Sequence, residues 1–225
     1  MKDAIRVIKR VLLFKISRGE MLKFTKGHFI AGLVGTWLVG VGRYWDDPGA
    51  SFLQHLGLGS VIYIFVLALF IWLIVLPLRV RDWKYFTVLT FISLTSLPAI
   101  LYAIPVEKFM GVEVANAINV WFLAIVAFWR LCLLFYFLSR FTELTVGMIT
   151  RLTLLPMCLI ISTLTVLNLH RVVFNIMGGM RETSAHDTAY TILYLLTGVS
   201  MVLSIPLLLG YCYDIYVRRR DDTLK

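Results

Sequence analysis

One arginine stands among apolar residues where the hydrocarbon of a membrane is expected. Arg130 lies near the middle of a predicted membrane span, in the run VWFLAIVAFWRLCLLFYFLSRF. A guanidinium at the bilayer centre costs about 2.5 to 3.5 kcal/mol even on lenient insertion scales, so polar partners or a ligand must offset that cost. Asn119 lies on the same helical face to within about 20°. Arg130 and Asn119 therefore predict a polar inner face at which an anionic or polar ligand could bind.

Hydroxyl groups in the third predicted span are further candidates to line this face. Thr90 and Ser93 belong to a series that recurs every three residues and precedes Pro98. Such hydroxyls donate to backbone carbonyls one turn earlier more often than they contact a ligand. The series therefore predicts either a structural polar core or a ligand path.

The partner that offsets the charge of Arg130 is left open by the sequence. No predicted span contains a central carboxylate, so the candidate partners are hydroxyls, carbonyls freed at proline kinks, or Asp214 and Glu143 reaching in from the cytoplasmic rim. Three interpretations follow: a structural polar core, an anion cavity lined by the arginine with Asn119 and the hydroxyls, and an arginine that snorkels to the interface.

Metal or acid–base chemistry would need the histidines and acids of the outward loops. His55, His170 and His186 are predicted at span ends or in loops, on the same side as Asp46 and Asp47. None of these histidines has the short helical spacing of a recognisable metal site. Adjacent acids in a turn point apart and are weak evidence for acid and base work. We therefore expect no metal, no cofactor and no catalytic residue.

The signatures of common enzyme classes are missing from the sequence. It contains no HExxH, GxxxxGK[ST], GxSxG or CxxC motif. Cys132, Cys158 and Cys212 fall within predicted spans and are expected to be small buried side chains without a disulfide framework. A nonenzymatic role is therefore favoured over an enzymatic one.

The elements that must position these residues are membrane spans. The chain has 225 residues, 60% of them apolar, and a mean hydropathy of +0.84. Because a helix needs about 20 apolar residues to cross hydrocarbon, we predict an all-α bundle of six spans, with bends at Pro98, Pro156 and Pro206. The predicted spans are residues 28–44, 58–78, 85–105, 118–138, 152–170 and 189–212.

Basic residues follow the predicted topology. Seventeen of the 22 Lys and Arg residues fall in the N-terminal segment, the loops after the second and fourth spans and the C-terminal tail. Cationic loops tend to stay in the cytoplasm, so both termini are predicted to be cytoplasmic. Short loops and this asymmetry favour a bacterial inner membrane. The net charge of +9 forms no basic patch with aromatic neighbours, so nucleic-acid binding is not expected.

Three glycines of the first span share one stripe. Gly32, Gly35 and Gly42 lie within about 80° of one another on a helical wheel. Glycines on one stripe let a neighbouring helix approach closely in lipid. The stripe predicts tight packing within the bundle, a seam between two copies, or part of a substrate path.

The basic segment 1–27 has an amphipathic pattern. Ile5, Ile8, Leu12 and Ile16 align at helical spacing, while most of the basic side chains lie away from them. The segment is either an interfacial helix on anionic lipid of the cytoplasmic leaflet or a frayed basic tail. Residues 213–225 are predicted to form a second basic tail in the cytoplasm.

Three functional hypotheses remain. The first is a nonenzymatic bundle that organises or supports a membrane complex. Its glycine stripe and its basic N-terminal helix would engage partner helices, a second copy or anionic lipid. The second is a small permease or channel-like carrier for a polar or anionic solute, with Arg130 lining the path. The third is an intramembrane enzyme that modifies lipid with the outward His and Asp residues.

Overall fold

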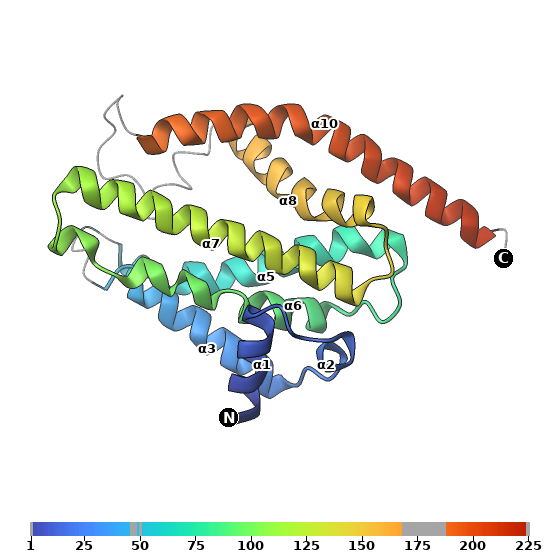
Figure 1. Ribbon diagram of the computed structural model, residues 1–225, viewed down its shortest axis with the longest axis horizontal. Coiled ribbons are helices and arrows are strands. Elements are labelled where there is room, and N and C mark those ends of the chain that lie inside the picture. The colour runs from blue at the N-terminus through green and yellow to red at the C-terminus, as the bar shows by residue number, and fades with distance from the viewer. Residues whose placement is uncertain (1, 46–48, 50, 168–187, 224–225) are drawn as a thin grey trace. The chain divides into compact units, whose positions relative to one another are not determined.

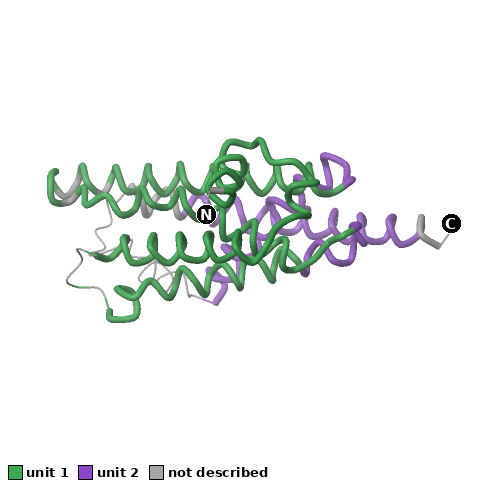
Figure 2. The backbone as a smooth tube through the Cα atoms, turned by 90° about the horizontal axis from the view of Figure 1, so that it is seen from below, with its two compact units in different colours: residues 1–72, 82–142 green, residues 73–81, 143–225 purple. Residues whose placement is uncertain are grey.

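The computed structural model describes residues 2–45, 49, 51–167 and 188–223, whose regular secondary structure is entirely helical (Figure 1). No strand occurs among these residues, so the predicted all-α class is confirmed for the described chain. The chain divides into two compact units, coloured in Figure 2. Unit 1 comprises residues 1–72 and 82–142, and unit 2 comprises residues 73–81 and 143–225.

Unit 1 contains the N-terminal helices and three of the predicted spans in full. Its elements are α1 (Lys2–Leu12), α2 (Arg18–Leu22), α3 (Lys26–Gly42), α4 (Phe52–His55), most of α5 (Leu58–Val75), α6 (Tyr85–Leu94), the 3₁₀ helices η2 (Leu97–Ala103) and η3 (Val106–Lys108), and α7 (Val112–Phe141). Helix α3 packs against α6 and η2, and α7 packs against η2 and η3.

Unit 2 contains the end of α5, the 3₁₀ helix η1 (Leu76–Leu78), α8 (Val146–Val166) and α10 (Thr188–Thr223). Helices α8 and α10 pack along one another, and α10 also contacts η1. Two bonds make the second contact: the Tyr211 hydroxyl donates to the Ile74 carbonyl at 2.7 Å, and Arg218 Nε donates to the Leu78 carbonyl at 3.1 Å. These donors satisfy carbonyls that the end of a helix leaves without an intrahelical partner.

Five helices in the described part of the chain are long and apolar enough to cross a membrane. They are Leu58–Leu78, Tyr85–Ala103, Ala117–Phe141, Val146–Val166 and Tyr194–Arg220. The predicted first span corresponds to α3, which has 17 residues and is therefore about 25 Å long at 1.5 Å per residue. A typical span needs about 20 residues, so the sixth crossing remains a prediction.

The third predicted span changes helix type halfway. Helix α6 ends at Leu94, and the chain continues as a 3₁₀ helix from Leu97 to Ala103 with Pro98 in its first turn. Proline has no N–H and cannot continue an α-helical ladder. Pro156 and Pro206 lie inside α8 and α10, which remain α-helical around them. The bends expected at these two prolines stay predictions.

Two helix boundaries differ from the expected ones. Helix α8 begins at Val146, before the expected start at 152, so Arg151 is part of a helix and not of a loop. Helix α10 continues to Thr223, so the described part of the expected tail 213–225 is helical. Charged side chains lower the hydropathy at the start of α8 and the end of α10, but a helix can extend beyond the hydrocarbon when packing supports it.

The N-terminal segment is folded onto unit 1 as two helices. Helix α1 ends at Leu12, and Phe14 takes a left-handed φ of 56°, which reverses the chain before α2. Ile16, expected on one continuous apolar face, lies after this turn and is buried. Its carbonyl accepts a hydrogen bond from the Tyr136 hydroxyl at 2.9 Å. The frayed-tail alternative does not describe these residues.

Candidate functional site

The site begins with Arg130, near the middle of α7. Its guanidinium carbon lies 5.5 Å from the centre of the Tyr63 ring on α5. Its Nη2 atom is buried and has no hydrogen-bond partner in the described structure. A cation over an aromatic face gains electrostatic energy from the ring, but a buried N–H group without an acceptor carries a desolvation cost. Arg130 therefore retains an unused donor inside unit 1.

A second arginine lies close to this group. Arg43 follows the last residue of α3, and its guanidinium carbon lies 5.1 Å from the Tyr102 ring centre and 5.6 Å from that of Tyr44. The Tyr102 phenol, on η2, lies within electrostatic range of Arg43, Arg130 and Tyr63. We call Arg43, Tyr63, Tyr102 and Arg130 the arginine–tyrosine cluster.

Three buried residues hold most of this cluster in place. Val39, Ala99 and Val126 form an apolar cluster between α3, η2 and α7, and Leu101 and Tyr102 pack against it. Arg43, Tyr102 and Arg130 each follow one of these residues by three or four positions. Residues three or four apart share one face of a helix. The apolar cluster therefore fixes the helices that carry both arginines and one tyrosine.

The predicted hydroxyls have different partners. Thr90 and Ser93 are fully buried on α6, and their hydroxyls donate to the carbonyls of Phe86 and Thr90, both at 2.8 Å. The Thr36 hydroxyl of α3 donates to the Gly32 carbonyl at 2.8 Å and lies 3.3 Å from the Ser93 carbonyl. These contacts join α6 to α3 and do not include the arginine–tyrosine cluster.

Asn119 is half-buried on α7, eleven residues before Arg130. The structure thus packs the part of α6 that carries Ser93 against the first predicted span. The hydroxyl bonds of Thr90 and Ser93 do not involve Arg130.

The glycine stripe is occupied by the chain itself. A Cβ at Gly32 would meet the Ser93 side chain and lie 3.0 Å from the Leu94 nitrogen. A Cβ at Gly35 would meet the Leu97 side chain, and one at Gly42 would lie 3.0 Å from the Ala103 Cβ. Close packing of α3 on α6 and η2 therefore requires these glycines.

Asp214, considered as a partner for Arg130, binds a different arginine. In unit 2 it accepts two hydrogen bonds from Arg151 of α8, at 2.7 Å from Nε and 2.6 Å from Nη2. Glu143, the other candidate, is exposed. The expectation failed for Asp214 because α8 begins early and carries Arg151 along the face that meets α10.

The outward histidines and acids give little support for a catalytic or metal site. His55 Nδ1 lies 3.2 Å from the Ser51 carbonyl. His170, His186, Asp46 and Asp47 lie outside the described residues. Within the described part of the chain, no group of three His, Cys, Asp or Glu side chains has the geometry to hold a metal. Cys132, Cys158 and Cys212 are all free thiols.

Sequence reasoning identified Arg130 but not its neighbours in the arginine–tyrosine cluster. Arg43 lies near the end of the first predicted span, 28–44, where an arginine is not unusual, and Tyr63 and Tyr102 are two aromatic residues among many. A usable signal was present, because an arginine at the end of one span and tyrosines near the same end of two others can meet there.

Helices of this length and apolarity indicate an integral membrane protein, with a cationic and aromatic cluster inside its larger unit. No protein-family model matches the chain, and neither a curated protein nor a solved structure shows detectable similarity to it. Its function is therefore inferred from its own residues.

Proposed function

We propose that this membrane protein binds a small anion at the arginine–tyrosine cluster and acts as a carrier for it. The observation that supports this most directly is the buried Nη2 of Arg130, which has no hydrogen-bond partner among the described residues. A carboxylate or phosphate oxygen would accept from this N–H group and neutralise a charge that is costly at membrane depth.

The chemistry of the cluster favours an anion over a cation or an apolar ligand. Arg43 and Arg130 supply two positive charges, and no described carboxylate forms an ion pair with either of them. Planar guanidinium groups match carboxylate and phosphate oxygens in geometry. Tyr63 and Tyr102 add aromatic faces against the arginines, and their phenol groups can donate a further hydrogen bond. A ligand with one carboxylate or phosphate group fits these donors.

The hypothesis of a supporting bundle is less favoured by the packing. Its proposed partner surfaces were the glycine stripe and the basic N-terminal helix, and Ser93, Leu97 and Ala103 of the same chain fill the space beside the stripe. The lipid-modifying hypothesis depends on histidines and acids that mostly lie outside the described residues. The carrier hypothesis alone uses a buried polar atom that the fold leaves without a partner.

Topology is part of the same proposal. The distribution of basic residues supports cytoplasmic termini and a bacterial inner membrane. Reporter proteins fused before Met1 and after Lys225 would both be active on the cytoplasmic side. Reporters on opposite sides would contradict an even number of crossings.

Anion binding can be tested by thermal unfolding of the purified protein in detergent. Phosphate, lactate and succinate are compared with glycerol and ethanolamine, and a ligand that binds only the folded state raises the unfolding temperature with its concentration. We expect at least one anion to stabilise the protein. Arg130→Gln should weaken that anion's binding about tenfold or more, equivalent to about 1.4 kcal/mol.

Arg140→Gln is the matched control for Arg130→Gln. Arg140 lies on the same helix, and its guanidinium carbon is 5.5 Å from the Tyr136 ring centre, but it is exposed. Anion binding should survive this change. Equal binding in the wild type and Arg130→Gln would remove the proposed site, and uptake of the stabilising anion into proteoliposomes distinguishes a carrier from a protein that only binds.

A further inference from the structure

The N-terminal hairpin, residues 2–24, is a distinct surface element of unit 1. It consists of α1, the turn at Phe14 and α2, and it buries Val11, Ile16 and Met21 against the rest of the unit. Two bonds fix it to α7: Trp129 Nε1 donates to the Leu12 carbonyl at 3.3 Å, and the Tyr136 hydroxyl donates to the Ile16 carbonyl at 2.9 Å. The hairpin therefore has a defined inner face and a defined outer face.

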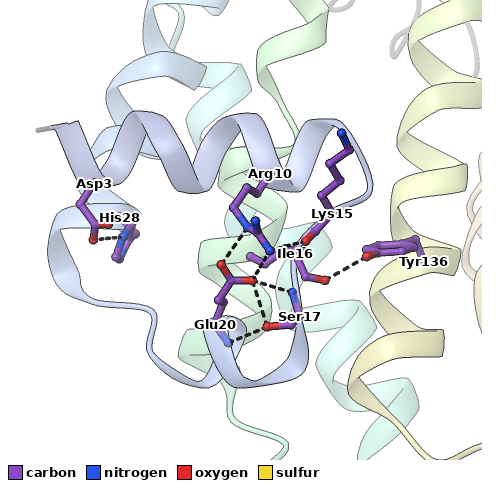
Figure 3. A network of polar contacts seen from close by, with 8 residues as sticks. All are labelled: Asp3, Arg10, Lys15, Ile16, Ser17, Glu20, His28 and Tyr136. Atoms are coloured by element: carbon purple, nitrogen blue, oxygen red, sulfur yellow. Dashed lines mark hydrogen bonds and ion pairs between the residues drawn. The ribbon is translucent and has the colours of Figure 1, made fainter.

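Both acids of the N-terminal segment, Asp3 and Glu20, contact side chains or backbone groups of unit 1 (Figure 3). Glu20 accepts from Arg10 at 3.0 Å and from the Ser17 backbone N–H at 2.9 Å. Asp3 Oδ2 lies 3.3 Å from Nε2 of the buried His28. The His28 Nδ1 accepts from the Thr25 backbone N–H at 3.1 Å, which places the proton of a neutral ring on Nε2, facing Asp3.

The basic side chains of the segment point outward instead. Exposed bases occur at Arg6, Lys9, Lys15, Lys23 and Lys26. None of them forms an ion pair within the described chain, and Glu20 is already paired with Arg10. Asp3 remains an exposed acid beside them, with its side chain 76% exposed. The outer face of the hairpin is therefore cationic by the excess of these five bases over one exposed acid.

Large apolar side chains share this outer face. Leu13 is 57% exposed and Ile5 48%, and Leu22 and Phe14 are also exposed. Figure 3 shows α1 lying crosswise to α7, the helix that it contacts. A helix that lies across membrane spans, with basic and apolar side chains on its free side, has the composition and direction of an interfacial helix.

We propose that the outer face of the N-terminal hairpin docks on the anionic lipid headgroups of the membrane that holds the spans. Lysine and arginine side chains contact the phosphates, while Ile5, Leu13 and Leu22 enter the boundary between headgroups and acyl chains. Ile16 does not take part, because its side chain is buried in unit 1. The inserted residues thus differ from those of a single amphipathic helix.

The test uses the full chain in lipid nanodiscs, with photoreactive benzoylphenylalanine at the position of Leu13. Discs of neutral phosphatidylcholine are compared with discs that contain phosphatidylglycerol, and phospholipid adducts are counted by mass spectrometry after illumination. We expect about threefold or more adduct in the anionic discs, since cationic segments concentrate at anionic surfaces. High salt should reduce the difference by screening.

Two controls separate docking from general contact with lipid. The same group at Ile125, an exposed apolar position on α7, should give adducts that do not depend on headgroup charge. Lys9→Gln, Lys15→Gln and Lys23→Gln together should remove the effect at Leu13, and Arg219→Gln with Arg220→Gln should not. These glutamine changes are at exposed positions, so the fold is expected to tolerate them.

Two outcomes would overturn the proposal. Equal adduct yields at Leu13 in neutral and anionic discs would show that the basic side chains do not select the lipid. Adducts to another polypeptide in native membranes, in place of phospholipid, would assign the outer face to a protein partner.

Discussion

Arg151 of α8 and Asp214 of α10 form a bidentate ion pair in unit 2. Nε and Nη2 of the arginine donate to the two carboxylate oxygens at 2.7 Å and 2.6 Å. The Asp214 side chain is 5% exposed and that of Arg151 is 31% exposed. Gly210 leaves room for the arginine, because a Cβ there would lie 2.7 Å from Arg151 Cδ. The pair therefore fixes how α8 and α10 meet at one end.

Replacing the acid of this pair should destabilise unit 2. Asp214→Asn removes the negative charge and leaves the arginine with a weaker acceptor. A fully buried pair that loses one partner costs about 3 to 5 kcal/mol, and the partial exposure of Arg151 lowers our expectation to about 1 to 3 kcal/mol. Thermal unfolding in detergent measures the change.

Asp82→Asn is the control for the same chemical change. Asp82 lies 3.8 Å from Arg18 in a pair whose side chains are 42% and 30% exposed, and pairs that solvent reaches contribute about 0 to 1 kcal/mol. If Asp82→Asn lowered the unfolding temperature as much as Asp214→Asn, the bidentate pair would have no special role in stability.

Adding one methyl group at Gly32 should separate α3 from α6. The Cβ would lie 2.9 Å from Ser93 Cβ and 3.0 Å from the Leu94 nitrogen, and overpacking of this kind costs about 1 to 3 kcal/mol. Gly59→Ala, on α5, is the matched control because nothing lies within 4 Å of its Cβ. We expect Gly32→Ala to unfold at a lower temperature and Gly59→Ala to unfold at or above that of the wild type.

Ser93→Gly offers a rescue that tests the cause of this effect. It removes the side chain that the new methyl group meets, so the double variant should be more stable than the sum of the single changes predicts. Additive losses would mean that Gly32 matters for a reason other than the approach of Ser93.

The helices were largely predictable because a membrane imposes strong constraints on composition. Hydrocarbon thickness requires long apolar runs. Helix α5 continued by η1 covers the span expected at 58–78, and α7 covers the one expected at 118–138. The ends were less predictable, since helices continue past the hydrocarbon where charged residues find partners. Arg151 and Asp214 each seemed to mark the end of a span, and each is instead part of a helix because it binds the other.

Of the four residues in the arginine–tyrosine cluster, the sequence alone points only to Arg130. Arg130 is recognisable alone, because a charge inside a span always needs an explanation. Arg43, Tyr63 and Tyr102 are ordinary near the end of a span, and their meeting depends on how α3, α5 and η2 pack. The same limit applies to Thr90 and Ser93, whose spacing does not distinguish a bond to a backbone carbonyl from a contact with a ligand.

Arg43 should contribute to anion binding as Arg130 does. Arg43→Gln removes one of the two charges near Tyr102, and we expect an affinity loss of about tenfold for the anion that stabilises the wild type. If one ligand contacts both arginines, the double variant Arg43→Gln with Arg130→Gln should lose less binding free energy than the sum of the two single variants. Concentration-dependent shifts of the unfolding temperature measure all three variants. Unchanged affinity in Arg43→Gln would restrict the site to Arg130.

Acid should loosen the N-terminal hairpin through Glu20. The Ser17 backbone N–H, and to a smaller extent the Ser17 hydroxyl and Arg10, hold the pKa of the Glu20 carboxyl below its ordinary value. A carboxyl with a lowered folded-state pKa adds stability above its unfolded pKa, and that stability is lost as the pH falls through the folded-state value. The contacts of Glu20 with Ser17 and Arg10 should therefore be intact at neutral pH and weaken below the ordinary pKa of glutamate, about 4.3.

Glu20→Gln should remove this dependence on pH. At neutral pH the variant should be less stable by about 0.5 to 1 kcal/mol, as expected for a partly exposed cap and ion pair, and the difference from the wild type should vanish in acid. Arg10→Gln should keep most of the pH dependence, because the Ser17 backbone bond is the largest cause of the lowered pKa. Unfolding temperatures between pH 7 and about pH 2 measure all three proteins, because the loss falls below the ordinary pKa of glutamate. A constant gap between the wild type and Glu20→Gln across this range would mean that the carboxylate charge does not hold the hairpin.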